Sequence, residues 1–171
     1  LHQEILNKLA ALPGVTSAAF GDSAPLETRL MNSNVLNVEG KTFSSPPVLR
    51  MRKIAPGFFY TMGTQIVAGR DFTWTDLYGG RHVAMISEDL AREWWGSPQA
   101  ALGNRIREHN NDPWREIVGV AADVHDNGVQ EAPPKLVYWP ALLDHYAWTG
   151  GGPFAGRFGM YAIRSRRARG S

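Results

Sequence analysis

The chain has 171 residues, 43% hydrophobic and 20% charged, so it can bury a core and is not a disordered tail. Although its net charge is +2, four of its eighteen Lys and Arg residues lie in the last eight positions. This leaves fourteen dispersed bases against sixteen acids, which argues against nucleic-acid binding, and the absence of cysteine excludes disulfides, thiolate metal ligands and cysteine nucleophiles.

The first half of the chain alternates between short helical and strand patterns. Residues 1–12 carry apolar residues at helical spacing, and Pro13 and Gly14 then end the helix. Residues 15–20 are typical of a strand, and a loop through Pro25 and Arg29 follows. Residues 35–38 and 48–54 alternate apolar and polar side chains and predict an antiparallel pair. Residues 56–63 predict a short helix with proline in its first turn and Gly63 at its end.

The second half contains the clearest local signal, a strand followed directly by a helix. After a brief apolar stretch at 65–69 and a polar turn at 71–76, residues 82–86 predict a strand. Ser87 is the expected N-cap of the next helix, whose apolar face consists of Leu90, Ala91, Trp94 and Trp95. Residues 103–107 and 114–124 predict a hairpin, and residues 136–139 and 160–163 predict two further strands.

A metal site is one hypothesis for the string that follows the hairpin. Asp123, His125 and Asp126 bring together carboxylate and imidazole ligands, which zinc and manganese accept. No H-E-x-x-H or similar spacing supplies further ligands, and a strand that runs into an Asp-Asn-Gly turn uses the same residue types for capping. Capping is therefore the favoured interpretation, and we assign no metal ligand and no cofactor.

The serine at the turn between strand and helix is the candidate for nucleophilic catalysis. Ser87 lacks the flanking glycines of a nucleophile elbow, so helix capping is the favoured role. His82, His109 and His145 stand apart in the sequence, and each is expected to face solvent without a partner. We therefore expect no catalytic residue and no enzyme activity.

Glycine–arginine strings and tryptophans are the remaining candidates for ligand binding. Gly69-Arg70 and Gly103-Asn104-Arg105 match no phosphate-binding loop and are interpreted as turns. The six tryptophans could form a stacking surface for a hydrophobic ligand, but aromatic residues on the apolar face of a short helix usually belong to the core.

Several strings, in this order, together resemble one known family. They are I-A-P-G-F-F-Y-T-M-G from Ile54, V-A-G-R-D-F-T from Val67, V-A-M-I-S-E-D-L-A-R-E-W-W-G from Val83, A-L-G-N-R-I-R from Ala101 and R-E-I-V-G-V-A-A-D-V from Arg115. The chain resembles the MacB-like periplasmic core domain of ABC transporter permeases, and its sequence is most similar to those of acidobacterial-type duplicated permeases.

The resemblance implies an α+β fold with two lobes. Residues 1–53 and 125–171 would build a discontinuous porter-like lobe, and residues 54–124 an inserted small α/β lobe. The family's outer lobe usually continues with another helix and strand beyond A-I-R-S-R-R, so we expect this lobe to be incomplete at its C-terminus. No apolar run reaches the roughly 20 residues of a spanning helix, so we expect the membrane segments elsewhere in the gene.

The implied function is mechanical. The domain would lie outside the cytoplasm, in the periplasm, and would transmit ATP-driven conformational change in a membrane-bound efflux transporter. Its expected partners are an ABC ATPase subunit, reached through the membrane part, a second permease copy and a periplasmic adaptor, and the isolated domain is expected to be a monomer. Two alternatives stay open: a hydrophobic-ligand binding module that uses its tryptophans, and a metal-dependent hydrolase that uses His125 with Asp123 and Asp126.

Overall fold

The computed structural model describes residues 1–22, 32–125, 130, 132–156 and 159–166. Its helices are α1 (His2–Ala10), α2 (Phe58–Met62), α3 (Trp74–Tyr78), α4 (Glu88–Trp95), α5 (Pro98–Ala101) and the 3-10 turn η2 (Ala147–Thr149). Its strands are β1 (Val15–Gly21), β2 (Asn32–Val35), β3 (Asn37–Val38), β4 (Val48–Ile54), β5 (Ile66–Gly69), β6 (Val83–Ser87), β7 (Arg105–Arg107), β8 (Arg115–Ala121), β9 (Leu136–Pro140), β10 (Leu142–Leu143), β11 (Phe154–Ala155) and β12 (Met160–Ser165). The predicted loop through Pro25 and Arg29 lies outside the described residues.

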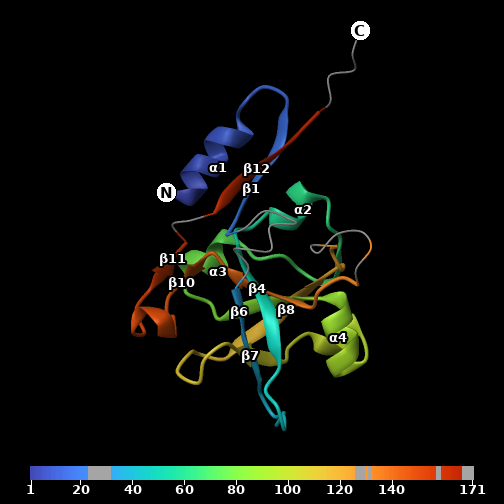
Figure 1. Cartoon of the computed structure of the whole chain (residues 1–171). Coiled ribbons are helices and arrows are strands. Elements are labelled where there is room, and N and C mark those ends of the chain that lie inside the picture. Colours follow the sequence, from blue (N-terminus) through green and yellow to red (C-terminus); the bar gives the residue numbers. More distant parts are fainter. Residues whose placement is uncertain (23–31, 126–129, 131, 157–158, 167–171) are drawn as a thin grey trace.

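One mixed sheet organises the part of the chain that the structure describes. Its ten strands follow the order β12-β1-β4-β9-β6-β8-β7-β3, and β2 and β5 pair with β4 and β8 off this path. The β4–β9 and β6–β8 pairs are parallel, whereas the other pairs of this sheet are antiparallel. Figure 1 shows α1 and the β1–β12 pair at one end of the molecule and β7 and α4 toward the other. The expected α+β class is confirmed.

Strands β6 and β9 form the centre of the fold, because all residues of both strands are buried. Successive side chains point to opposite faces of a sheet, and here they enter two different clusters. Met85 and Tyr138 pack with the phenylalanines of α2 on one face. Ile86 and Trp139 pack with Leu90 of α4 on the other. A sheet covered on both faces accounts for the continuously apolar strings that the sequence shows at these strands.

The predicted helices α1, α2 and α4 are confirmed, and so is the hairpin of β7 and β8. Helix α1 buries Leu6 against Phe20 of β1, and the chain turns at Gly14, whose φ of 79° is readily adopted by glycine. Helix α4 buries Leu90 and Ala91, and its two tryptophans are only partly buried against the same cluster.

Two predictions of local structure need correction. The polar segment at 71–76 is not only a turn, because helix α3 begins at Trp74. Thr73 and Asp76 form a reciprocal capping box in which each side chain accepts a hydrogen bond from the other's backbone nitrogen. The predicted strand at 35–38 is divided: β2 pairs with β4 as expected, whereas β3 leaves this pair and joins β7.

The division into two lobes stays a prediction. The sheet passes through strands from both proposed lobes, since β9 lies between β4 and β6 and hydrogen-bonds to each. This junction positions a group of buried polar side chains, described next.

Candidate functional site

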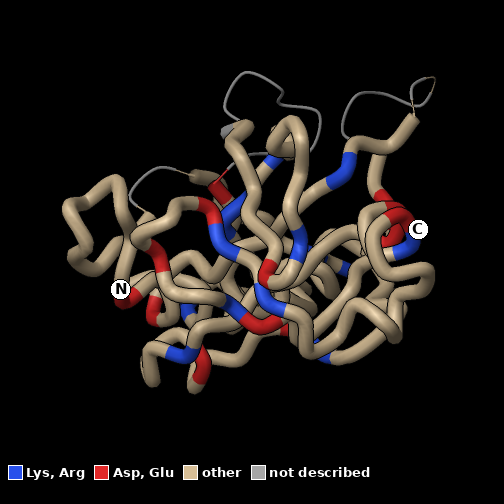
Figure 2. The backbone as a smooth tube through the Cα atoms, turned by 90° about the horizontal axis from the view of Figure 1, so that it is seen from below, with Lys and Arg blue, Asp and Glu red and all other residues tan. Residues whose placement is uncertain are grey.

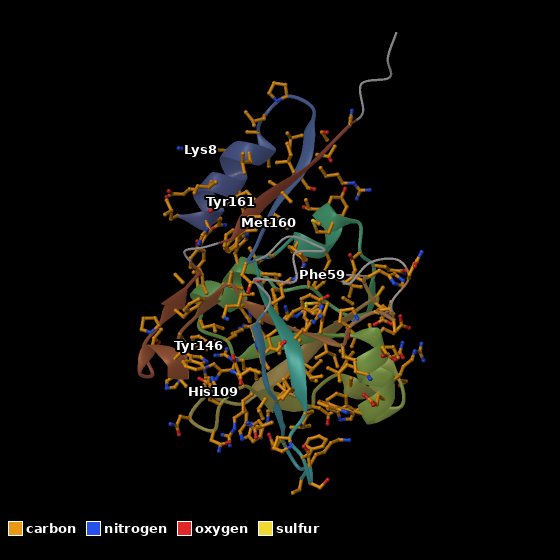
Figure 3. The ribbon with its side chains drawn as sticks, viewed as in Figure 1. Lys8, Phe59, His109, Tyr146, Met160 and Tyr161 are labelled. Atoms are coloured by element: carbon orange, nitrogen blue, oxygen red, sulfur yellow. The ribbon has the colours of Figure 1, made fainter. Side chains whose placement is uncertain are left out.

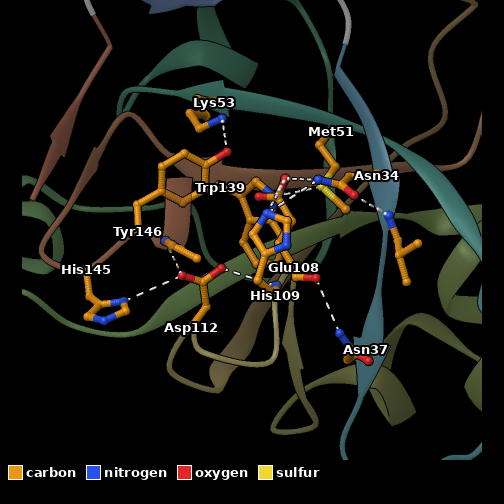
Figure 4. A network of polar contacts seen from close by, with 12 residues as sticks. Asn34, Asn37, Met51, Lys53, Glu108, His109, Asp112, Trp139, His145 and Tyr146 are labelled. Carbon is orange, nitrogen blue, oxygen red and sulfur yellow. Dashed lines mark hydrogen bonds and ion pairs between the residues drawn. The ribbon is translucent and has the colours of Figure 1, made fainter. Parts of the chain in front are cut away.

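A network of buried and half-buried polar side chains lies beside the β4–β9 pair (Figure 4). We define the polar network by its members, which are Asn34, Asn37, Lys53, Glu108, His109, Asp112, Arg115, His145 and Tyr146. They come from β2, β3, β4, the turn after β7, the start of β8 and the segment before η2. The fold thus brings together polar side chains from segments that lie up to about a hundred positions apart in the sequence.

Glu108 anchors one half of the polar network and is only 6% exposed. The Asn34 amide donates to its carboxylate at 2.8 Å, and the Asn37 amide donates to its backbone oxygen at 3.3 Å. Burial and the neighbouring Glu108 carboxylate raise the pKa of the Tyr146 phenol far above its ordinary value. Lys53, itself buried, donates to the Tyr146 hydroxyl oxygen at 3.4 Å. Tyr146 therefore stays protonated and serves as a bridge between a cation and an anion.

Asp112 anchors the other half. One carboxylate oxygen accepts from the Ala147 backbone nitrogen at 2.8 Å, and the other accepts from the backbone nitrogen of His109 at 3.2 Å. The His145 Nδ1 atom lies 3.5 Å from the first of these oxygens. Arg115 donates to the His145 carbonyl at 3.0 Å. Asp112 and Arg115 thus fasten the segment around η2 to the hairpin of β7 and β8.

Three histidines expected to face solvent without partners each lie beside a carboxylate instead. His82 contacts Asp144 at 2.9 Å, His145 faces Asp112, and His109 Nε2 lies 3.8 Å from Glu108. The prediction of unpartnered histidines was wrong because each partner is distant in sequence or is oriented by a turn. The string E-H-N-N-D at 108–112 was the available signal, since so many polar residues beside two strands indicate a turn with its own hydrogen bonds.

The hydrogen bonds of the polar network join segments that are far apart in the sequence. Catalysis by acyl transfer or hydrolysis needs a nucleophile beside a base and a place for substrate. Here each oxygen of Asp112 accepts a backbone hydrogen bond, and Lys53 and Tyr146 are directed at each other. The arrangement gives a cross-linked junction between strands and loops.

The proposed metal residues do not converge among the described residues. Asp123 accepts a hydrogen bond from the Asp89 backbone nitrogen at 3.0 Å, which caps the first turn of α4. His125 is exposed, and Asp126 lies outside the described residues. Within the described ranges, no three His, Asp or Glu side chains are grouped so that they could hold a metal ion. The capping interpretation of this string is confirmed for Asp123.

Ser87 occupies the N-cap position of α4, as predicted, but its side chain does not cap the helix. Its buried hydroxyl oxygen accepts a hydrogen bond from the Leu136 backbone nitrogen at 3.0 Å, at the start of β9. The expected capping role was wrong because Asp123 supplies the cap and leaves the serine free to join two strands.

The glycine–arginine strings support turns and packing. Arg70 makes two hydrogen bonds to the Asp76 carboxylate, at 2.6 and 3.1 Å. A Cβ atom on Gly69 or Gly119 would overlap a backbone oxygen of the neighbouring strand segment, so these two strands approach closely. Arg105 pairs with Glu39 at 2.5 Å. The turn interpretation is confirmed for Gly103, but it was wrong for Gly69, which ends strand β5 and pairs with Gly119 of β8.

The tryptophans are spread over the molecule and share no single surface. Trp139 lies in the core and donates to the Met51 sulfur at 3.3 Å. Trp94 and Trp95 contact Phe43 and Lys41. Trp148, on η2, is 70% exposed. The hydrophobic-ligand alternative therefore gains no support from a common aromatic site.

Comparisons with known proteins identify relatives by sequence and by fold. The model of the family described as "MacB-like periplasmic core domain" matches residues 3–157. None of the curated proteins matches the chain significantly. Among solved structures, the periplasmic region of MacB from Actinobacillus actinomycetemcomitans has a TM-score of 0.63 and 18% identity, over 99% of this chain and 66% of that one.

Two further structures have the same fold. The extracellular domain of the noncanonic ABC-type transporter YknZ from Gram-positive bacteria has a TM-score of 0.56 and 16% identity, over 97% of this chain and 73% of that one. A domain of a putative permease protein from Porphyromonas gingivalis has a TM-score of 0.56 and 20% identity, over 93% of this chain and 60% of that one. Among the helices that the structure describes, none is long and apolar enough to cross a membrane.

Proposed function

Because the chain belongs to the family of MacB-like periplasmic core domains, we propose that it is the extracytoplasmic domain of an ABC transporter permease and transmits ATP-driven conformational change. The family match over residues 3–157 carries this proposal, and it confirms the resemblance seen in the sequence. The chain spans 66% of the MacB periplasmic region that it resembles, so the partners and the cargo belong to the proposal.

The packing of the domain supports a mechanical role. A part that passes on motion has to move as a unit, and interiors packed on both faces of a sheet resist deformation. Strands β6 and β9 are buried throughout, and the polar network ties β2, β4, the hairpin of β7 and β8 and the η2 segment together. A displacement applied at the β1–β12 end would therefore reach the β3–β7 end.

The partners follow from the proposed role. An ABC ATPase subunit would act through the membrane part of the permease, and a second permease copy would carry a second domain of this kind. As the domain moves relative to the second copy, its surface would contact the cargo or a periplasmic adaptor. We propose the two lobes, residues 1–53 with 125–171 and residues 54–124, as parts of one unit that the motion displaces together.

Spin-label distances in the full-length permease, assembled with its ATPase in lipid nanodiscs, test this proposal. The described chain has no native cysteine, and Glu4 and Gln99 are exposed on α1 and α5, so each can be replaced by a labelled cysteine. A label at Gln99 in both permease copies should report a change in the distance between copies when ATP is trapped in the ATPase. The distance between copies should stay constant with an ATPase that cannot bind ATP.

Labels at both Glu4 and Gln99 of one copy measure deformation within the domain. We expect this internal distance to change less than the distance between copies. If active ATPase leaves the distance between copies unaltered in the trapped state, the proposed transmission is wrong.

A further inference from the structure

The charges of the chain are divided unevenly between the two ends of the molecule. The sequence segments 5–21, 56–69 and 159–171 contain five of the eighteen Lys and Arg residues and none of the sixteen Asp and Glu residues. The rest of the chain therefore has thirteen bases against sixteen acids. Such a separation of sign creates a local field even though the net charge is small.

The fold brings the described residues of these segments, 5–21, 56–69 and 159–166, to one end. Strand β12 pairs with β1 along its whole length, and the Arg166 backbone nitrogen donates to the Gly14 carbonyl at 2.9 Å. The Arg164 guanidinium donates to the Tyr60 carbonyl of α2 at 3.0 Å and lies 5.6 Å from the centre of the Tyr60 ring. Helix α1, β1, β12 and α2 thus contact one another at the end of the molecule that Figure 1 shows uppermost.

Exposed apolar and cationic side chains alternate at this end. Leu12 is 50%, Tyr60 63% and Ile163 52% exposed. Lys8 extends away from α1 into solvent in Figure 3, and Arg164 and Arg166 are exposed on β12. We call this set the basic end; its members are Lys8, Leu12, Tyr60, Ile163, Arg164 and Arg166. Glu4, in the first turn of α1, is the acid on the same helix.

The opposite end of the molecule has no such bias. Figure 2, which views the molecule from the side opposite the β1–β12 end, shows Lys and Arg interleaved with Asp and Glu. Of the exposed cations there, Arg92 pairs with Glu88 and Arg105 pairs with Glu39, whereas Lys41 donates to the Trp94 carbonyl. Arg164 donates to a carbonyl and lies beside an aromatic ring, and among the described residues no acidic side chain pairs with it.

We infer that the basic end binds an anionic lipid surface. Basic side chains near a charged bilayer are attracted to it electrostatically, and exposed Leu, Ile and Tyr side chains enter the headgroup region. Nucleic acid would be attracted by the same charges, but it needs cations in a groove or stripe and gains nothing from exposed Leu12 and Ile163. The alternation of apolar and basic residues therefore favours lipid.

This inference rests on the proposed function in one respect: the proposed function places this end near a membrane. Contact between the basic end and lipid would orient the domain relative to the bilayer. The vesicle experiment below can fail while the distance measurement in the permease succeeds, and the reverse is equally possible.

Co-sedimentation of the 171-residue chain with vesicles tests the inference. We expect binding to vesicles that contain phosphatidylglycerol, little binding to vesicles of phosphatidylcholine alone, and release as salt screens the exposed charges. Replacing both Arg164→Gln and Arg166→Gln should weaken binding about twenty-five-fold, at about five-fold for each basic residue near the surface. The matched control, Arg92→Gln with Arg105→Gln, removes the same charge elsewhere and should bind like the parent chain.

A second pair of variants separates lipid from nucleic acid. Leu12→Ser with Tyr60→Ser should weaken binding to phosphatidylglycerol vesicles and leave any binding of a single-stranded oligonucleotide unchanged. Because all these side chains are exposed, we expect each variant to fold, and circular dichroism of each variant checks this. Equal effects of the two arginine pairs, absence of vesicle binding, or an oligonucleotide bound more tightly than the vesicles would each overturn the inference.

Discussion

Replacing Asp76 by asparagine should destabilise the domain, because it removes a buried charge that holds the start of helix α3. The Asp76 carboxylate is 1% exposed. One oxygen accepts from the Thr73 nitrogen at 3.0 Å and from Arg70 at 2.6 Å, and the other accepts from Arg70 at 3.1 Å. Asparagine has one oxygen where aspartate has two, so its NH₂ group must face one of these N–H donors and cannot accept a hydrogen bond from it.

The magnitude follows from these contacts. Hydrogen bonds to a charged group contribute about 1.5 to 3 kcal/mol each, and a capping residue contributes about 1 kcal/mol. The Arg70 side chain is 44% exposed, so water replaces part of what it loses. We expect the free energy of unfolding to fall by about 2 to 3 kcal/mol, which at a slope of about 2 kcal/mol per molar lowers the urea midpoint by about 1 M.

The effect should depend on pH in a defined direction. Burial acts to raise the pKa of Asp76, but the hydrogen bonds from Arg70 and Thr73 outweigh it and lower the pKa below its ordinary value. A carboxyl group with a lowered pKa stabilises the fold above its unfolded pKa of about 3.9, and this stabilisation is lost as pH falls through the folded pKa. The difference between the parent chain and Asp76→Asn should therefore be full at neutral pH and shrink in strong acid.

Urea unfolding followed by tryptophan fluorescence measures the difference. The control is Glu88→Gln, which breaks the exposed pair with Arg92 at 2.8 Å and should cost about 0.5 kcal/mol. If Asp76→Asn shifts the midpoint no more than Glu88→Gln does, the carboxylate does not stabilise α3 as argued.

Three further predictions concern other parts of the fold. Gly119→Ala would push a Cβ atom into the Arg70 backbone oxygen and should lower stability by about 1 to 3 kcal/mol in a thermal melt, whereas Gly152→Ala, where the nearest atom lies 3.7 Å away, should change it little. The pKa of Asp144 is lowered because His82 and Arg115 outweigh the effect of burial. Asp144→Asn should therefore lower the stability above about pH 4 and leave it unchanged in stronger acid. Melting temperatures measured across this pH range would contradict the prediction if the loss were the same at every pH. Asp123→Ala should lower stability by about 1 kcal/mol through the lost cap on α4, and a chelator should leave the melting temperature of the parent chain unchanged; a melting temperature that falls with chelator would restore the metal hypothesis.

Local patterns in the sequence predicted most strands and helices, because they depend on neighbouring residues. The apolar spacing of α1, the continuous apolar strings of β6 and β9, and the glycine after α4 are all signals within a few positions. Helix α3 was missed because Asp76 is as suitable for a turn as for a capping box, and only the backbone conformation decides between them.

The polar network could not be predicted from these patterns. Lys53 and Tyr146 are 93 positions apart, and Asn34 and Glu108 are 74 apart, so their contacts depend on the order of strands in the sheet. The structure buries Lys53, one of three cations in the alternating strand at 48–54, and a buried lysine requires a partner. That signal indicates that a partner exists without telling which residue it is.

The position of β9 has a consequence for how the chain acquires its structure during synthesis. Strands β4 and β6 each leave one edge open until residues 136–140 insert between them. Until these residues have been synthesised, two partial sheets expose unpaired backbone N–H and C=O groups, and such edges aggregate or recruit chaperones. Because this closing step joins residues far apart in the sequence, we expect folding to be slow and to depend on residues 136–140 being available.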